Sequence, residues 1–427
     1  MIAETLIEKA MKKAQGAQAL LTQSEHTRVS FESDKLKSVE SSQRTDIRLR
    51  VVLNGKVGLS NTTDINDLDG VVARAIECAE FGSSAHFQFP NPQEGTDVKI
   101  YDDKVIPVSK TEMVKISQEM MDLVKQYNPN IMVYAGVDKN VLKREFANSS
   151  GVKFTDEETH FSTGVFGVLV RGNDILEAGY GFGCKRRDID HISIANRVVE
   201  LFKMAENTAT IKSGNMPVIF TPSGMEVLLL ALELGFNGKN VFLGSSPLAG
   251  KLGEKIADER FSLIDNPLID YASASRKYDD EGVPHQVTPL IDKGIVKSFL
   301  YDLDTAGRSG TKTTGHGIGC NPTNLVIKEG ETSFEEMVKN TKEGLIVESV
   351  MGLGQGNPIS GEFSVNVQLG YKIENGEIVG RVKDVMLAGN TYDALKNILA
   401  IGDKSEWVYG SLLTPYVQIG SLSVVTK

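Results

Sequence analysis

The densest group of potentially reactive side chains lies between residues 279 and 285. Asp279, Asp280 and Glu281 precede a turn, and His285 follows it. Carboxylates and an imidazole at this spacing could bind a divalent cation, or one carboxylate could act as a general base if burial raised its pKa. Acidic residues are also common in solvated turns between strands, and such a turn is the simpler interpretation.

His316 lies in a second polar segment, SGTKTTGHG (309–317), with a glycine on either side of it. Such a segment could be a mobile loop that contacts a substrate, or an ordinary surface loop. The six histidines never occur as a close pair, so neighbouring imidazoles do not indicate a metal site. We therefore assign Asp280, Glu281, His285 and His316 as candidate substrate contacts, and we assign no metal ligand.

A leucine-rich segment, MEVLLLALELGFNG (225–238), follows the strand-like residues PVIF. Pro222 suits the first turn of a helix and Gly235 suits the position after its end, which predicts a helix of about twelve residues. At about 100° per residue, its two glutamates and Leu230 share a narrow face, and the remaining apolar residues cover the opposite arc. This pattern is typical of a helix that packs against a core.

Common motifs of hydrolases and nucleotide-binding proteins are absent from the sequence. It contains no G-x-S-x-G, no Walker loop and no H-E-x-x-H. The glycine-rich segments GYGFG (179–183) and GLGQGNP (352–358) lack the strand and helix of a dinucleotide site, so we interpret them as turns or close backbone approaches. Cys78, Cys184 and Cys320 are scattered, as expected for reduced structural thiols.

The predicted elements divide the chain into three units. Residues 1–85 and 105–210 each combine helices with runs of alternating apolar residues, and a turn-rich linker separates them. Residues 216–427 form the largest unit, which is rich in short strands and hairpins. Because the strands come in runs instead of alternating singly with helices, we expect an α+β fold with antiparallel sheets.

Charge and hydropathy exclude several classes of partner. The formal net charge is −10, and no run of lysine or arginine could neutralise nucleic-acid phosphates, so direct nucleic-acid binding is not expected. No uncharged stretch approaches the roughly 18 residues of a membrane span. The N-terminal residues have the charge pattern of an amphipathic helix and not of a signal peptide. We expect a soluble, cytoplasmic protein.

Several longer segments resemble the TldD/PmbA family, and within it the PmbA (TldE) branch. They are, in chain order, RVSFESDKLKSVESSQRTDIRLRVVLNGKVGLSNTTD, PVIFTPSGMEVLL, DDEGVPHQVTPLIDKGIVKSFLYDLDTAGRSGTKTTGHG, NPTNLVIKEGETSFEEMVKNTKEGLIV, SGEFSVNVQLGYKIENGEIVGRVKDVMLAGN and LKNILAIGDKSEWVYGS. No single segment is diagnostic, but their order along nearly the whole chain is specific.

The resemblance implies a zinc peptidase domain that has lost its zinc ligands. In the catalytic branch of the family, a strand is followed by a helix with H-E-x-x-x-H, and a later cysteine is the third ligand. Alignment of the strand without gaps places the first histidine at Leu230, the glutamate at Ala231 and the second histidine at Gly235. No histidine lies between His191 and His285, and no cysteine follows Cys320, so a shifted register would restore no ligand.

The resemblance therefore implies a non-catalytic or weakly catalytic subunit in proteolysis. Such subunits pair with a zinc-bearing TldD-like subunit in a closed chamber that degrades or trims unfolded peptides, including bacteriocin precursors and antitoxins. We expect this chain to bind no cofactor, and we expect the zinc in the partner. The branch name, modulator of DNA gyrase, fits an indirect effect through such peptides better than contact with DNA.

Two alternatives remain open at this point. One is a self-sufficient metal-dependent hydrolase that uses Asp279, Asp280, Glu281 and His285. The other is a homodimeric peptide-binding scaffold without a catalytic partner. The sequence does not choose between heterodimer and homodimer.

Overall fold

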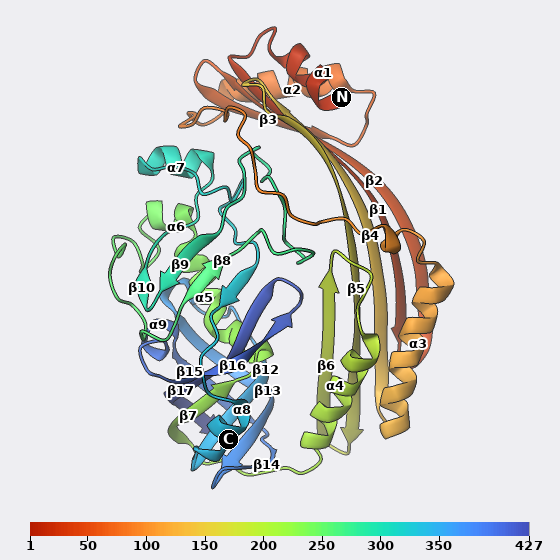
Figure 1. The fold of residues 1–427 in the computed structure, drawn as a ribbon, viewed down its shortest axis with the longest axis vertical. Coiled ribbons are helices and arrows are strands. Elements are labelled where there is room, and N and C mark those ends of the chain that lie inside the picture. The colour runs from red at the N-terminus through yellow and green to blue at the C-terminus, as the bar shows by residue number, and fades with distance from the viewer. Residues whose placement is uncertain (427) are drawn as a thin grey trace.

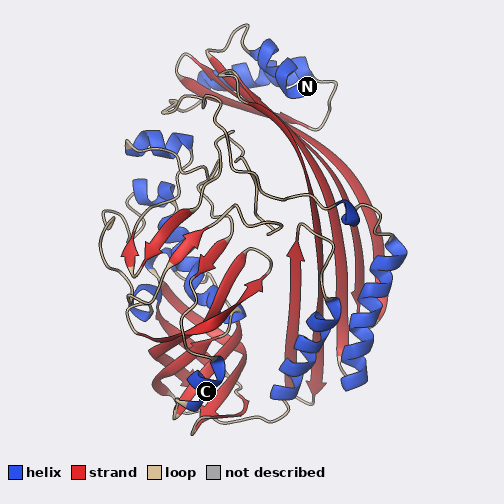
Figure 2. Ribbon diagram, in the orientation of Figure 1, coloured by secondary structure: helices blue, strands red, loops and turns tan. Residues whose placement is uncertain are grey.

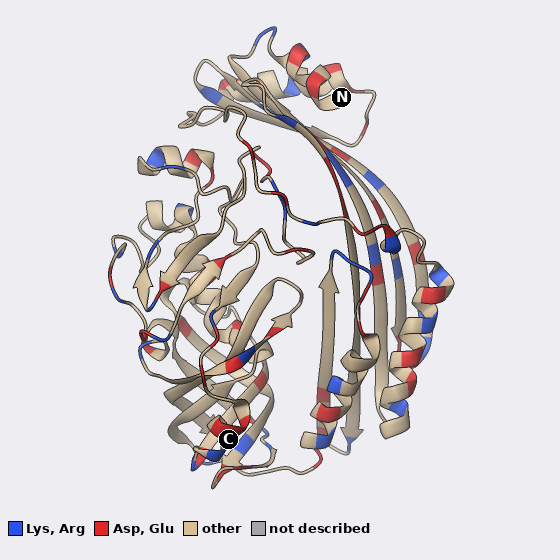
Figure 3. Ribbon diagram, in the orientation of Figure 1, with Lys and Arg blue, Asp and Glu red and all other residues tan. Residues whose placement is uncertain are grey.

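The structure, a computed structural model, describes residues 1–426 and confirms an α+β fold with mainly antiparallel sheets. Figures 1 and 2 show a long curved sheet and a compact β-rich part that lies inside its curve. None of the helices within these residues is both long and apolar enough to cross a membrane. Acidic and basic residues alternate along α3 and mix along the long strands (Figure 3).

The curved sheet contains six strands in the order β3-β2-β1-β4-β5-β6. Their bounds are β1 Gly16–Glu32, β2 Lys35–Leu53, β3 Lys56–Thr62, β4 Met132–Asn148, β5 Lys153–Arg171 and β6 Asp174–Cys184. The helices of this part are α1 Ile2–Ala10, α2 Leu68–Phe81, η1 Asp103–Val105, α3 Lys110–Tyr127 and α4 His191–Met204. Because β1 pairs with β4 from Gln18↔Asn148 to Phe31↔Ala135, the units predicted at 1–85 and 105–210 share one sheet.

Alternation along the strands gives the curved sheet an apolar face and a polar face. In β1, Ala19 and Leu21 belong to the core beneath α1 and α2, and Val29 and Phe31 belong to the core beneath α3 and α4. Because side chains alternate across a strand, the residues between them point to the other face, which faces the C-terminal part. This second face carries polar residues such as His26, Arg28 and Ser30.

The C-terminal sheet contains eleven strands. Their bounds are β7 Gly214–Phe220, β8 Leu263–Asp265, β9 Thr288–Asp292, β10 Ile295–Val296, β11 Leu325–Ile327, β12 Glu343–Met351, β13 Glu362–Glu374, β14 Glu377–Arg381, β15 Val385–Asn390, β16 Ile398–Val408 and β17 Leu412–Thr426. The helices are η2 Ser223–Met225, α5 Glu226–Phe236, α6 Gly238–Phe242, α7 Leu303–Ser309, α8 Phe334–Lys339, η3 Pro358–Ser360 and α9 Thr391–Ala394.

Two predicted helix ends are wrong. Gly235 lies inside α5, which continues to Phe236, and Asn237 follows as the C-cap. The segment FEEMVKNTKEG, with a capping box of Ser333 and Glu336 at its start, predicts a helix that ends at Gly344. This helix ends instead as α8 at Lys339, because residues from Glu343 onward join the sheet as β12 beside β13. In both places tertiary packing overrides the local signal that a glycine gives.

Candidate functional site

Helix α5 is a packing helix with one partly open face, as its pattern predicts. Its buried residues are Val227, Leu228, Leu229, Ala231, Leu232, Gly235 and Phe236. Glu226 and Leu230 are half-buried, and Glu233 is exposed. The helix follows β7 through η2, where the Thr221 hydroxyl accepts a hydrogen bond of 3.1 Å from the Gly224 amide. The strand and the helix thus stand in the expected order.

Neighbouring residues fill the space around positions 230, 231 and 235. Leu230 and Ala231 line a small, partly open cavity of about 10 Å³, together with residues of the glycine-rich segment 352–358. The Tyr392 hydroxyl donates a hydrogen bond of 3.1 Å to the Ala231 carbonyl. A β-carbon built on Gly235 would lie 2.5 Å from the same hydroxyl oxygen. Any side chain at position 235 would therefore have to displace Tyr392 or the helix.

The acidic turn at 279–285 is buried, so its interpretation as a solvated turn is wrong. Asp279 is 3% exposed, Glu281 is fully buried and His285 is 7% exposed. Only Asp280 keeps a partly exposed side chain, at 38%. Burial of this many ionisable groups requires compensating hydrogen bonds and ion pairs.

Each carboxylate of this turn faces a different set of partners. Asp279 accepts hydrogen bonds from the backbone amides of Glu281, Val283 and Gly317. Glu281 pairs with Arg50 of β2 at 2.7 Å and accepts from the Leu303 amide. These contacts connect the turn to the curved sheet and to its own loop. They explain why Asp279 and Glu281 are buried without a ligand.

Asp280 points away from its neighbours toward the curved sheet. It pairs with Arg144 of β4 at 3.2 Å and lies 3.7 Å from Arg276. Burial raises the pKa of Asp279, and the Glu281 carboxylate raises it further. The three carboxylates are adjacent in sequence, but they do not converge on one point.

The two predicted histidines lie close together without a shared ligand position. The ring centroids of His285 and His316 are 6.3 Å apart. His316 Nε2 is bonded to Asp265 at 2.8 Å, and its Nδ1 to Thr314 at 2.9 Å. Burial lowers the pKa of His285 to about 3, and His316 and nearby arginines contribute. Among residues 1–426, no group of three His, Cys, Asp or Glu side chains could hold a metal ion.

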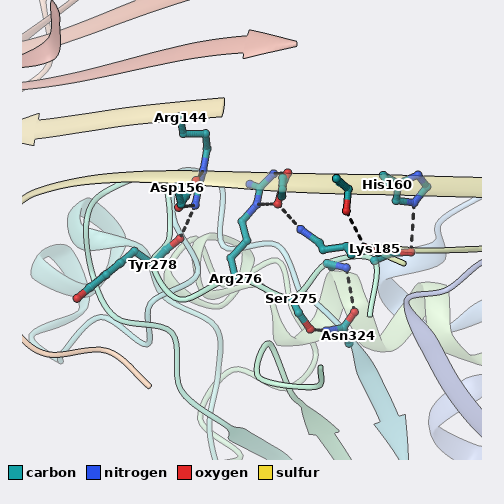
Figure 4. Close-up of polar contacts among 12 residues, drawn as sticks. Arg144, Asp156, His160, Lys185, Ser275, Arg276, Tyr278 and Asn324 are labelled. Atoms are coloured by element: carbon teal, nitrogen blue, oxygen red, sulfur yellow. Dashed lines mark hydrogen bonds and ion pairs between the residues drawn. The ribbon is translucent and has the colours of Figure 1, made fainter. Parts of the chain in front are cut away.

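A second buried network, which the sequence did not reveal, joins the C-terminal part to the curved sheet (Figure 4). Arg144 forms a bidentate pair with Asp156, with distances of 2.9 and 2.6 Å. Glu158 pairs with Lys185 and with Arg276. Burial alone would raise the pKa of Glu158, but these two cations outweigh it and hold that pKa below its usual range. These ion pairs position the loop that carries the acidic turn.

A further candidate site is a cleft of about 590 Å³ between the curved sheet and the C-terminal part. Residues from both faces of β6 line it, Glu177 and Gly179 from one face and Ala178 and Tyr180 from the other. The opposite wall includes Ser223, Glu348, Ser349, Gln368, Leu369, Val408 and Tyr409. A volume of this size is typical of ligand sites.

Strand β6 presents a free edge to this cleft, because it pairs only with β5 among the described strands. Arg381 donates to the Ile175 carbonyl, and Ser273 donates to the Gly183 carbonyl. Since outward-pointing groups alternate along an antiparallel edge strand, Glu177, Gly179 and Gly181 also direct their N–H and C=O groups away from β5. Within residues 1–426 the backbone N–H and C=O groups of these three residues have no hydrogen-bond partner outside the curved sheet.

The segment GYGFG is therefore part of an edge strand and not a turn. Its alternating glycines give the strand no side chains of its own on one face, and the Phe166 side chain of β5 lies over Gly179 there, 2.6 Å from where a β-carbon would stand. The pattern of glycines was visible in the sequence, but the free edge was not, because strand order is a tertiary property. The predicted contacts Asp280, Glu281, His285 and His316 do not line this cleft.

Comparisons with known proteins agree with this architecture. A family model described as the PmbA/TldA metallopeptidase C-terminal domain matches residues 213–426, and the model for domain 1 matches residues 17–79. The metalloprotease PmbA of Escherichia coli O157:H7 is 25% identical, over 97% of this chain and 94% of that protein.

Two solved structures have closely similar folds. One is a protein of Thermotoga maritima named as a candidate modulator of a DNA gyrase, with a TM-score of 0.92 and 25% identity over 99% of both chains. The other is TldE of Thermococcus kodakarensis, with a TM-score of 0.92 and 23% identity over the whole of both chains.

The fold and the C-terminal domain place the chain among the metallopeptidase-like α+β proteins of two sheets. The chain belongs to the PmbA/TldE family.

The family's description as metallopeptidases implies a metal, but the aligned residues of this chain do not fit one. Leucine, alanine and glycine at positions 230, 231 and 235 have no side-chain atom that binds zinc. The Tyr392 hydroxyl and the segment over Leu230 occupy the surrounding space. No chemical step at α5 can therefore be derived from a metal.

Proposed function

We propose that this chain is the non-catalytic subunit of a TldD/TldE-type metallopeptidase, which acts in proteolysis of unfolded peptides. The observation that carries the proposal is the filled position on α5. The strand and the helix are present, and Tyr392 and the segment 352–358 fill the space beside Leu230 and Ala231, the positions where the family resemblance leads us to expect metal ligands. In this proposal a TldD-like partner supplies the zinc.

The free edge of β6 gives the subunit a means to hold the peptide. Glu177, Gly179 and Gly181 direct unpaired backbone groups into the cleft, and an extended peptide could pair with them as an added strand. Main-chain pairing does not depend on the peptide's sequence, which suits substrates of varied composition. The buried turn at 279–285 supports the rival hydrolase less well, because its carboxylates face separate partners.

The test is a cleavage assay with a fluorogenic unfolded peptide. The full chain is assayed alone and with a TldD-like partner from the same cell, each with and without a zinc chelator. The proposal predicts cleavage only with the partner present, and its loss on chelation. Chelator-sensitive cleavage by the pure chain would contradict the proposal.

Two controls sharpen the assay. An unrelated protein that dimerises with the partner must not replace this chain. In a TldD-like partner whose H-E-x-x-x-H glutamate is changed to Gln, cleavage must disappear although the pair still forms, because that carboxylate takes the proton of the zinc-bound water. If the unrelated dimeriser restored full cleavage, the proposed role in peptide holding would be wrong.

A further inference from the structure

One carboxylate in the cleft has no cationic partner. Glu177 accepts a hydrogen bond of 2.5 Å from the side-chain amide of Gln368 on β13, and no ion pair to it occurs among residues 1–426. A hydrogen bond from a neutral amide leaves the negative charge of Glu177 uncompensated. It lies on the strand edge that borders the cleft, within reach of a bound molecule.

The other charged residues that line the cleft are already paired. Lys37 pairs with Glu32 at 2.8 Å, and Arg28 lies 3.8 Å from Asp138. Glu348 is 4% exposed and lies 3.5 Å from Arg197. Arg28 and Lys37 stay more than half exposed in these pairs, so the one lining charge without an ionic partner within residues 1–426 is negative and is located at Glu177.

The Glu177 carboxylate would lie beside a peptide strand that binds along the edge of β6. A peptide added to the edge of β6 would have one residue directly opposite Glu177, with both side chains on the same face of the sheet. Opposite residues in such a pair have β-carbons about 5 Å apart, so a lysine or arginine side chain can reach the carboxylate. The Gln368 amide would release Glu177 as the cation replaces it.

We propose that Glu177 is the specificity-determining residue of this cleft and selects extended peptides with a lysine or arginine at the position opposite it. The inference rests on the proposed peptide-holding role of β6. It adds a preference for a class of side chain, which main-chain pairing alone does not give.

The test measures binding of labelled peptides to the full chain by fluorescence anisotropy. Three peptides share one uncharged, extended sequence and differ at a single central residue, which is lysine, norleucine or glutamate. We expect the lysine peptide to bind about fivefold more tightly than the norleucine peptide, and the glutamate peptide to bind more weakly than either. The preference should shrink as the salt concentration rises.

Variants assign the preference to one residue. Glu177→Gln keeps the size and hydrogen bonding of the side chain, and we expect lysine and norleucine peptides to bind it equally. Glu157→Gln is the matched control, because Glu157 lies on the neighbouring strand β5, is half-exposed and pairs with Lys143 at 3.5 Å. In this control the preference for lysine should persist.

The outcomes separate the inference from the proposed function. Equal binding of all three peptides to the unchanged chain would overturn the inference and leave peptide holding intact. A lysine preference that survives Glu177→Gln would overturn the assignment to Glu177. If none of the peptides bound, alone or with the TldD-like partner present, both the inference and the peptide-holding role would fail.

Discussion

At the scale of single residues, the ionisable groups that the sequence marks as reactive are mostly structural. Glu281 and Asp280 each pair with a cation from another part of the chain, and so does Glu158, which the sequence did not single out. Sequence spacing singled out this cluster, but the favoured interpretation as a solvated turn was wrong, because Asp279, Glu281 and His285 are drawn into one buried region. It could not give the partners, since Arg50 and Arg144 lie more than a hundred residues away in the sequence.

Glu158→Gln should destabilise the protein strongly. The change leaves Lys185 and Arg276 buried without their counter-charge, and removal of one partner from a buried ion pair costs about 3 kcal/mol. Urea unfolding measures the change in free energy. The adjacent Glu157→Gln is the control, because its side chain is 51% exposed, and its effect should stay within about 0.5 kcal/mol. Equal effects of the two changes would refute the structural role of Glu158.

His285 should make stability depend on pH in the acid range. Its pKa is about 3 in the fold, against about 6.5 in an unfolded chain, because burial disfavours its charged form. Between these values only the unfolded chain binds the proton, so its contribution to stability is present above about pH 6.5 and is lost as the pH falls. Through this histidine, the free energy of unfolding changes by at most about 1.4 kcal/mol per pH unit.

The measurement is urea unfolding of the unchanged chain and of His285→Gln between about pH 7 and pH 5. The other ionisable groups, Asp279 among them, are the same in both proteins, so the difference between the two curves reports His285. The variant should lose less stability on acidification. Parallel curves would show that His285 titrates normally.

At the scale of elements, helix α5 was the most predictable part of the molecule and β6 the least. The leucine pattern and the preceding strand placed α5 correctly, although Gly235 proved to be internal. The ladder pairing that makes β6 an edge strand depends on contacts between β1 and β4, which join segments far apart in the sequence. No local pattern reports such pairing.

Gly235→Ala should test the tight contact at α5. Alanine is the better helix former, so a solvent-exposed helix would gain up to about 1 kcal/mol. Here the new β-carbon would lie 2.5 Å from the Tyr392 hydroxyl, and overpacking of this kind costs about 1–3 kcal/mol.

A double-mutant cycle with Tyr392→Phe isolates this contact, because that change removes the hydroxyl. We expect Gly235→Ala to destabilise the unchanged protein and to cost less in the Tyr392→Phe background, as measured by urea unfolding. If the cost were the same in both backgrounds, Tyr392 would not be the residue that fills position 235.

At the scale of the whole molecule, the curved sheet and the C-terminal sheet enclose a cleft with a free strand edge on one wall. The α+β class followed from runs of strands in the sequence. The cleft did not, since it forms between β6 and strands that lie about two hundred residues later. The function proposed for this arrangement is to hold a peptide while the chemistry takes place in a partner.

The most direct test of this account is the zinc content of the purified chain, alone and in complex with its TldD-like partner, by mass spectrometry of the eluted metal. We expect far less than one zinc ion per isolated chain, and about one per heterodimer, carried by the partner. Stoichiometric zinc in the isolated chain that a chelator removes, with loss of peptidase activity, would contradict it.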